Sequence, residues 1–291
     1  MKVFYSEKQV VDQGVQGFGY IKSPSAMKPK QLAKALESFP GIEFIEPNPV
    51  TRDDFKLCHA PEYVDGILDL EENNGFGNRS ESVNQSLKYT NGAMYDAAVA
   101  ATADSPTAAL VAGFHHAGYS CWEGFGYFCT FNGLMLTAMK LVKSGRRVAI
   151  VDCDMHDGNG TDDILKHFGY PTEIFHASFG KSYISPLHAQ RYLNSMAEGG
   201  ELEKKLIKHK SDVILYQAGA DVHVKDPFGG IFETDQIYER DRRMFVIAKK
   251  LQIPLAWDLA GCYQIEPDGS IGKVLEIHLN TFRACQEVYK N

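Results

Sequence analysis

The chain has 291 residues, of which 44% are hydrophobic, and a formal net charge of −7. The hydrophobic share is large enough for a substantial buried core, which excludes intrinsic disorder as the main state. The acidic excess argues against a protein that binds a phosphate backbone, which needs a basic face. We therefore expect a globular protein with no nucleic-acid partner.

The six cysteines form no C-x-x-C pair, so we expect reduced thiols in a reducing compartment. The N-terminal apolar run is too short for a signal peptide. No stretch approaches the roughly 20 apolar residues that a membrane span needs. We expect a cytoplasmic protein with no membrane partner. A homo-oligomer is compatible with the sequence.

Seven short apolar runs rich in β-forming residues alternate with longer segments of helical spacing. The runs are Lys2–Tyr5, Ile42–Ile45, Thr107–Val111, Val148–Val151, Glu173–His176, Val213–Tyr216 and Ile253–Trp257. The helical segments are Pro29–Phe39, Val83–Ala103, Asn132–Lys143, Asp162–Phe168, Glu201–Lys208, Asp235–Leu251 and Gly272–Val288. This alternation predicts one α/β domain over residues 1–291, with a mainly parallel sheet between two layers of helices.

Four of the apolar runs lead into side chains capable of acid–base or metal chemistry. They are followed by His115-His116, by Asp152-Cys-Asp154-Met-His156, by Asp221 and by Tyr263. Ligands of open parallel sheets bind beyond the carboxyl ends of the strands. A single polar residue after a strand means little, but four such endings indicate a functional site.

The segment VDCDMHDGNGT carries the most specific signal. Its residues Asp152, Asp154 and His156 alternate along the chain and therefore lie on one side of an extended segment. Carboxylate and imidazole groups suit zinc, and a catalytic zinc site needs three protein ligands and an open position. Asp154, His156 and the distant Asp221 would provide these three. The residues alone leave a surface turn open, because D-G-N-G is also typical of turns.

The adjacent histidines His115 and His116 carry a weaker signal. Neighbouring side chains point in different directions, and one of such a pair is often an ordinary polar residue at a strand end. Gly113 and Gly118 indicate a tight backbone near a ligand, although glycine is also common in loops. On the residues alone, a structural role for the pair stays open.

Several ordered motifs resemble the histone deacetylase superfamily, which includes acetylpolyamine amidohydrolases and related bacterial deacetylases. They are CHAPEYVDGIL, VAGFHHA, YFCTFNG, VDCDMHDGNGT, AGAD followed by DPFGG, and AGCY. The likeness spans roughly Leu57 to Tyr263. It implies an arginase/deacetylase-like fold and zinc-dependent hydrolysis of an acyl amide, chiefly acetyl, on a lysine-like or polyamine-like amine.

The resemblance also implies two kinds of metal site. Asp154, His156 and Asp221 would bind a catalytic Zn²⁺, for which Fe²⁺ or Co²⁺ could substitute. A structural K⁺ would lie beside this loop, held by backbone carbonyls near Asp152, Asp154 and His156 and near Ser178.

The catalytic side chains follow from the same resemblance. His116 would be the general base that deprotonates water and later protonates the leaving amine. His115, oriented by Asp152, would be its electrostatic partner and the more basic of the two. The Tyr263 hydroxyl would polarise the carbonyl and stabilise the oxyanion. The flanking Gly261 would leave room for the tyrosine to move in.

Phe128 and Phe179 are expected to wall a narrow apolar channel that grips an alkyl-amine chain. Among the departures from the family pattern, two bear on the channel and on the base. Tyr127 stands where relatives have glycine, so the channel should differ in shape. Asn159 stands where some relatives have the aspartate that pairs with the second histidine. A neutral partner should leave the pKa of His116 lower, as suits a base at neutral pH.

Two other functions remain open from the sequence. An arginase-type ureohydrolase with two manganese ions would need extra bridging aspartates, and the chain shows no second set. A relative that binds metal without catalysis would need neither the histidine pair nor Tyr263. The expected substrate is a small-molecule or peptide acylated amine, and the sequence does not choose among acetyl-lysine, acetylated polyamines and other acyl amines.

Overall fold

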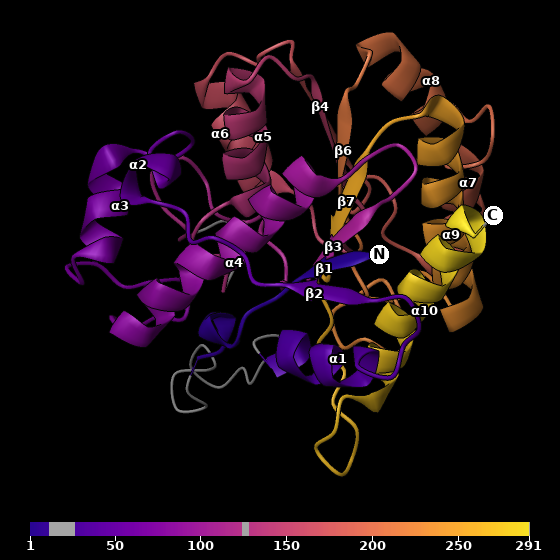
Figure 1. Ribbon diagram of the computed structural model, residues 1–291, viewed down its shortest axis with the longest axis horizontal. Coiled ribbons are helices and arrows are strands. Elements are labelled where there is room, and N and C mark those ends of the chain that lie inside the picture. The colour runs from indigo at the N-terminus through magenta and orange to yellow at the C-terminus, as the bar shows by residue number, and fades with distance from the viewer. Residues whose placement is uncertain (12–26, 124–127, 291) are drawn as a thin grey trace.

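Seven parallel strands form one sheet in the computed structural model, which describes residues 1–11, 27–123 and 128–290 (Figure 1). The strands are β1 (Lys2–Phe4), β2 (Glu43–Ile45), β3 (Thr107–Ala109), β4 (Val148–Asp152), β5 (Ile174–Ser178), β6 (Val213–Gln217) and β7 (Leu255–Asp258). They lie in the order β2-β1-β3-β7-β6-β4-β5, and each neighbouring pair is parallel. The predicted mainly parallel α/β fold is therefore confirmed.

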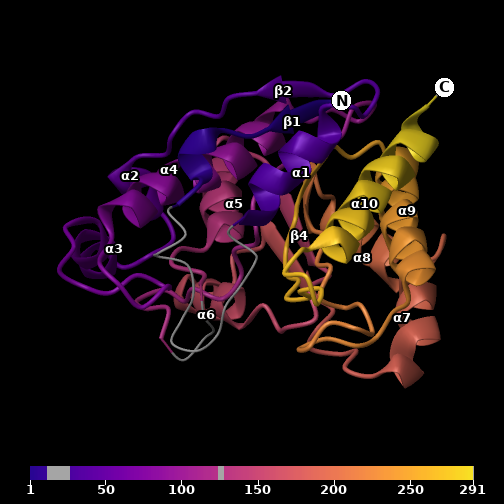
Figure 2. The same ribbon diagram turned by 90° about the horizontal axis from the view of Figure 1, so that it is seen from below.

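Helices cover both faces of the sheet. They are α1 (Lys28–Leu36), α2 (Arg52–Phe55), α3 (Pro61–Leu68), α4 (Glu81–Ala100), α5 (Gly133–Lys143), α6 (Asn159–His167), α7 (Ala189–Ser195), α8 (Glu201–His209), α9 (Thr234–Leu251) and α10 (Gly272–Tyr289). Figures 1 and 2 show α1 and α7 to α10 on one side and α2 to α6 on the other. None of the helices in these described ranges has the length and apolar composition needed to cross a membrane.

Two hydrophobic cores lie against the two faces of the sheet, which explains why central strands such as β4 are almost continuously apolar. In β4, Ala149 and Val151 point into the core beneath α7 to α10. Val148 and Ile150 point into the core beneath α2 to α6. A strand buried on both faces has no polar face, unlike the alternating strand of a half-exposed sheet. The central strands are thereby rigid supports for the loops that follow them.

The boundaries of several elements differ from those expected from the sequence. Helix α6 begins at Asn159, three residues before the predicted start at Asp162, because the turn at Gly158 leads directly into it. Strand β5 extends to Ser178 because that residue pairs in register with Asp152 of β4. Helix α3 was not expected, and its Pro61 occupies the first helical turn, where a missing amide hydrogen costs nothing.

A buried arginine on α9 connects two strand ends. Arg240 is fully buried, and its Nη1 donates hydrogen bonds to the carbonyls of Cys153 at 3.0 Å and Gly219 at 2.7 Å. Its Nε and Nη2 donate to Asp241 at 2.8 and 2.7 Å. Asp241 also accepts hydrogen bonds from Tyr216 and Thr281. This network fixes the spacing of the loops that follow β4 and β6.

We predict that Arg240→Met lowers the free energy of unfolding by about 3–5 kcal/mol, because it leaves the Asp241 carboxylate buried without its ion-pair partner. Arg242→Met is the matched control. Arg242 lies on the same helix and pairs with Glu239 and Glu287 at the surface, so its loss should cost less than about 1 kcal/mol. Urea denaturation measures both changes. Equal, small losses for the two variants would contradict the role of Arg240 as a buried support.

Candidate active site

Two buried carboxylates and one histidine converge at the carboxyl ends of β4 and β6. Asp154 and His156 lie in the loop after β4, and Asp221 lies in the loop after β6. Nδ1 of His156 is 3.1 Å from Oδ1 of Asp154 and 2.9 Å from Oδ2 of Asp221. One potential ligand atom from each of the three side chains lies within 4.8 Å of the other two. The structure thus brings the three predicted metal ligands together.

The electrostatics of this cluster suit a divalent cation. Burial and the nearby Asp154 charge raise the pKa of Asp221 to about 7. Burial also opposes ionisation of Asp154, but His115 and His156 outweigh it and lower the pKa of Asp154. Nitrogen and oxygen ligands lie about 2.0–2.2 Å from a zinc ion, so two ligand atoms of one ion are at most about 4.4 Å apart. Nδ1 of His156 lies within this distance of an oxygen of Asp154 and of Asp221. The residues present therefore fit such an ion.

His115 forms a buried pair with Asp152 at the end of β4. Its Nδ1 donates to Oδ2 of Asp152 at 2.6 Å, and the other oxygen of Asp152 accepts from Nε2 of Gln217 at 2.9 Å. Burial lowers the pKa of His115, but the charges of Asp152 and Asp154 outweigh it and raise that pKa to about 9. His115 is therefore a positive charge in the wall of the site at neutral pH.

His116 has the opposite character. Its Nδ1 lies 2.9 Å from Oδ1 of Asn159, and the same oxygen accepts the backbone N–H of Gly160. An amide oxygen can only accept, so Nδ1 carries the proton and Nε2 has a free lone pair. Burial, followed by the charge of His115, lowers the pKa of His116 to about 3. The pKa of His116 is therefore low, as the sequence predicted. Burial and the charge of His115 lower it, whereas the hydrogen bond to Asn159 does not.

Tyr263 follows β7 and faces the cluster. Its ring centroid is 6.2 Å from that of His156, and the His116 and His156 centroids are 5.9 Å apart. Its backbone N–H donates to Asp226 at 2.7 Å. Burial, together with Asp154 and Asp221, raises the pKa of Tyr263 well above its usual value. The hydroxyl therefore stays protonated and can donate a hydrogen bond.

Comparison with known proteins places this chain in a family. The model of the histone deacetylase domain matches residues 24–187, more than half of the chain. The chain belongs to this family. It is 29% identical to histone deacetylase 2 of Arabidopsis thaliana over 171 residues, which are 52% of this chain and 42% of that protein. It is 40% identical to the acetylpolyamine amidohydrolase of Mycoplana ramosa over 65 residues, 22% of this chain and 17% of that one.

A solved structure of similar fold is the acetylpolyamine aminohydrolase from Burkholderia pseudomallei, with a TM-score of 0.71 and 16% identity. The match covers 99% of both chains. At that identity the likeness concerns the fold alone. The chain aligns with less than two thirds of the length of each of the first curated relatives that it matches.

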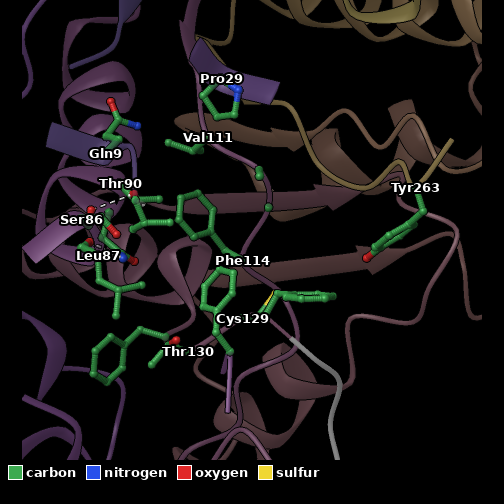
Figure 3. Close-up of a pocket in the computed structure, with 17 residues that line it drawn as sticks. Gln9, Pro29, Ser86, Leu87, Thr90, Val111, Phe114, Cys129, Thr130 and Tyr263 are labelled. Carbon is green, nitrogen blue, oxygen red and sulfur yellow. Dashed lines mark hydrogen bonds between the residues drawn. The ribbon is translucent and has the colours of Figure 1, made fainter. Parts of the chain in front are cut away.

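The residues expected to form the channel lie in different places. Phe128 and Tyr263 line the same cavity, and the Phe128 ring packs on Phe76 at a centroid distance of 5.5 Å. Figure 3 shows this cavity, with Tyr263 at one side. Phe179 instead stacks on Tyr192 at 4.5 Å in the core beneath α7 to α10 and borders a separate cavity. The structure therefore does not bring Phe179 opposite Phe128 at this cavity. Tyr127 lies outside the described residues.

Ser178 and Gly180 lie against the loop that carries His156. The Ser178 hydroxyl accepts the backbone N–H of Gly158 at 2.9 Å, and β5 pairs Ser178 with Asp152. At Gly180 an added Cβ would overlap the carbonyls of Met155 and His156. Several carbonyl groups are thus close together on this side of the loop.

Lys28 and Gln217 support the site but were not singled out from the sequence. Lys28 is fully buried and its Nζ donates to the carbonyl of Gly261, so burial lowers its pKa. Gln217 joins Asp152 to the backbone N–H of Phe114. A lysine at a helix start usually lies at the surface, and the sequence contains no signal that marks this one as buried.

Gly261 has a φ of +60°, and a Cβ there would overlap the carboxyl of Asp221. Gly269 has a φ of +83° with nothing within 4 Å of an added Cβ. Gly269→Ala should cost about 1–2 kcal/mol from backbone strain alone, and Gly261→Ala about 1–3 kcal/mol more from overpacking. Urea denaturation of both variants measures this difference. Similar losses would show that Gly261 does not closely contact the Asp221 carboxylate.

Proposed function

We propose that this protein is a zinc-dependent hydrolase of acyl amides on lysine-like or polyamine-like amines. The observation that carries the proposal is that the rings of His116 and Tyr263 both pack edge-on to the ring of His156, the most exposed member of the predicted metal cluster. A metal-binding protein without catalysis would need neither a neutral histidine nor a protonated tyrosine there. Family membership and the names of the relatives support deacetylation.

Asp154, His156 and Asp221 would hold the ion. When bound, zinc acts as a Lewis acid that polarises the acyl carbonyl and lowers the pKa of water, and Fe²⁺ or Co²⁺ could do the same. Two carboxylate ligands offset the charge of the ion, so water is acidified less than by an all-histidine site. A protein base is therefore needed.

His116 is the base in this proposal. Its free Nε2 accepts a proton from water as the water oxygen bonds to the acyl carbon. The same nitrogen then protonates the amine as the carbon–nitrogen bond breaks. The first products are the carboxylic acid and the amine, which ionise to a carboxylate and an ammonium ion, so both protons of the water are accounted for. His115, held charged by Asp152, limits how strongly His116 retains the proton and so favours its return to the leaving group.

Tyr263 would donate its hydroxyl hydrogen to the acyl oxygen as negative charge develops there. Gly261, with its left-handed backbone, places the tyrosine loop directly against the Asp221 and Asp154 carboxylates. Lys28 restrains the same loop through its hydrogen bond to the Gly261 carbonyl. These contacts would hold the hydroxyl near the reacting group.

A structural potassium ion forms part of the proposal. The backbone of Asp152, Asp154, His156 and Ser178 would supply its oxygen ligands. The register of β4 with β5 and the close approach of Gly180 to two carbonyls support this placement. A small-molecule or peptide acylated amine remains the proposed substrate.

Tyr263→Phe tests the proposal. With the zinc-loaded protein and acetylated polyamines or acetyl-lysine peptides as substrates, we predict that kcat/KM falls about 10²–10³-fold while bound zinc is unchanged. Tyr170→Phe is the control, because Tyr170 is exposed. Unchanged hydrolysis by Tyr263→Phe, or no hydrolysis of any acylated amine by the native protein, would refute the assignment.

Asn159→Asp tests the base. A carboxylate next to Nδ1 favours the charged imidazolium and raises the pKa of His116, by about one unit or more. The base acts in its unprotonated form, so the acidic limb of the kcat/KM profile should move to higher pH by the same amount. A pH–rate profile of the native protein and the variant measures the shift. An unmoved acidic limb would rule out His116 as the titrating base.

A further inference from the structure

The Tyr263 hydroxyl takes no part in holding its own side chain. Among the residues that the structure describes, none forms a hydrogen bond with this hydroxyl, which leaves it available to the acyl oxygen. Figure 3 shows the side chain at one side of the cavity, apart from the other labelled residues. A donor of this kind acts only when it is held within hydrogen-bond reach of the developing charge. The backbone contacts around Tyr263 therefore decide how well it can work.

The residue before Tyr263 has a strained backbone. Cys262 has a φ of +92°, a value that residues with a side chain rarely adopt. Such a conformation costs free energy and persists only where the surrounding structure holds it. Cys262 is also fully buried, so the holding contacts come from neighbouring protein groups. These contacts fix the direction in which the chain enters the tyrosine.

The buried carboxylate of Asp226, in the loop after β6, makes such contacts. Its side chain lies almost entirely out of solvent. Its Oδ2 accepts the backbone N–H of Tyr263 at 2.7 Å, and the Cys262 thiol donates to the same carboxylate. Two consecutive residues of the loop after β7 are thus bound to one side chain of another loop. A rotation of the Cys262 backbone would break both hydrogen bonds.

Asp226 is itself fixed by its own loop. Its Oδ1 accepts the backbone N–H of Phe228 at 3.0 Å, and its own N–H donates to the His223 carbonyl at 2.9 Å. At Gly229 an added Cβ would overlap the Asp221 carbonyl, so the loop folds back tightly on the residue that carries a predicted metal ligand. The carboxylate is therefore a firm anchor for the neighbouring loop.

We propose that Asp226 is a positioning residue, which keeps Tyr263 in its working place by retaining the strained backbone of Cys262. The proposal rests on the amidohydrolase function proposed above. Without the carboxylate, Cys262 returns to a negative φ, and the rotated peptide carries the Tyr263 ring away from His156. The loop that provides Asp221 to the metal thereby also sets the position of the oxyanion donor.

Asp226→Asn tests the proposal, because it keeps the side-chain volume but turns one acceptor atom into a donor. Its amide oxygen stays on the Phe228 N–H, since asparagine forms the same local turn, and its NH₂ group then faces the Tyr263 N–H. With the zinc-loaded protein and acetylated polyamines or acetyl-lysine peptides, we expect kcat to fall about tenfold to a hundredfold. KM and bound zinc should be unchanged.

Asp268→Asn is the matched control. Asp268 lies in the same loop as Tyr263 and accepts the Ser270 N–H at 2.9 Å, but it is exposed. This variant should keep the native kcat. A native kcat in Asp226→Asn as well would overturn the positioning role and leave the hydrolase intact. If the native protein cleaves no acylated amine, both proposals are overturned.

The same substitution in a Tyr263→Phe protein separates positioning from general damage. If Asp226 acts through the tyrosine hydroxyl, Asp226→Asn should change kcat by less than about twofold once that hydroxyl is absent. A variant that merely loosens the fold would lose activity equally in both backgrounds. Equal losses in the native and Tyr263→Phe backgrounds would therefore overturn the proposal.

Cys262→Gly tests the part played by backbone strain. Glycine adopts a φ of +92° without steric cost, so adding this change to Asp226→Asn should restore kcat about tenfold. No recovery would overturn the strain argument. Amide exchange of the native protein decides the question even if Asp226→Asn does not fold. The Tyr263 N–H should exchange at least about a hundredfold more slowly than the Ser270 N–H, and equal rates would overturn the anchor.

Discussion

The close approach of two buried carboxylates, Asp154 and Asp221, is the constraint on which the rest of the site depends. Both are almost completely shielded from water, and buried like charges raise each other's free energy steeply. The structure brings positive or neutralising groups to them from several sides, with Nδ1 of His156 in contact with both. Such a pair is favourable only beside compensating charge, and a bound divalent cation would supply that charge.

The sheet order explains how residues distant in sequence surround these carboxylates. Strands β3, β7, β6 and β4 are consecutive in the sheet, and their carboxyl ends lead to the histidine pair, Tyr263, Asp221 and Asp154. Each strand contributes a different chemical role because each is followed by its own loop. Arg240 from α9 and Lys28 from α1 then fix the backbone of those loops. The helices thus position the site without contributing reacting groups.

The histidine pair illustrates how similar side chains acquire opposite properties from their partners. A buried carboxylate holds His115 charged, whereas burial and that charge keep His116 neutral. The separation of their pKa values is what an acid–base mechanism needs. It depends on which residue each imidazole contacts, so a change at Asp152 or Asn159 should alter the chemistry without moving the histidines.

The sequence predicted the sheet and the convergence of the metal-cluster residues because both follow local rules. Apolar runs between helical segments imply a parallel sheet, and polar residues after such runs meet at one edge. Arg240 and Lys28 could not be predicted in the same way, since a charged residue in an amphipathic helix is normally exposed and only tertiary packing buries it. The packing of Phe179 could not be predicted for a related reason: an aromatic residue after a strand can face a cavity or the core, and only the folded structure shows that it stacks on Tyr192.

The most direct test of the metal cluster is a calorimetric titration of the metal-free protein with zinc, combined with metal analysis of the loaded protein. We predict one tightly bound zinc ion per chain, lost in Asp221→Asn and in His156→Ala but retained in His167→Ala, whose imidazole is exposed on α6. Two ions bound per chain, or unchanged zinc affinity in the Asp221 and His156 variants, would contradict a single zinc ion held by this cluster.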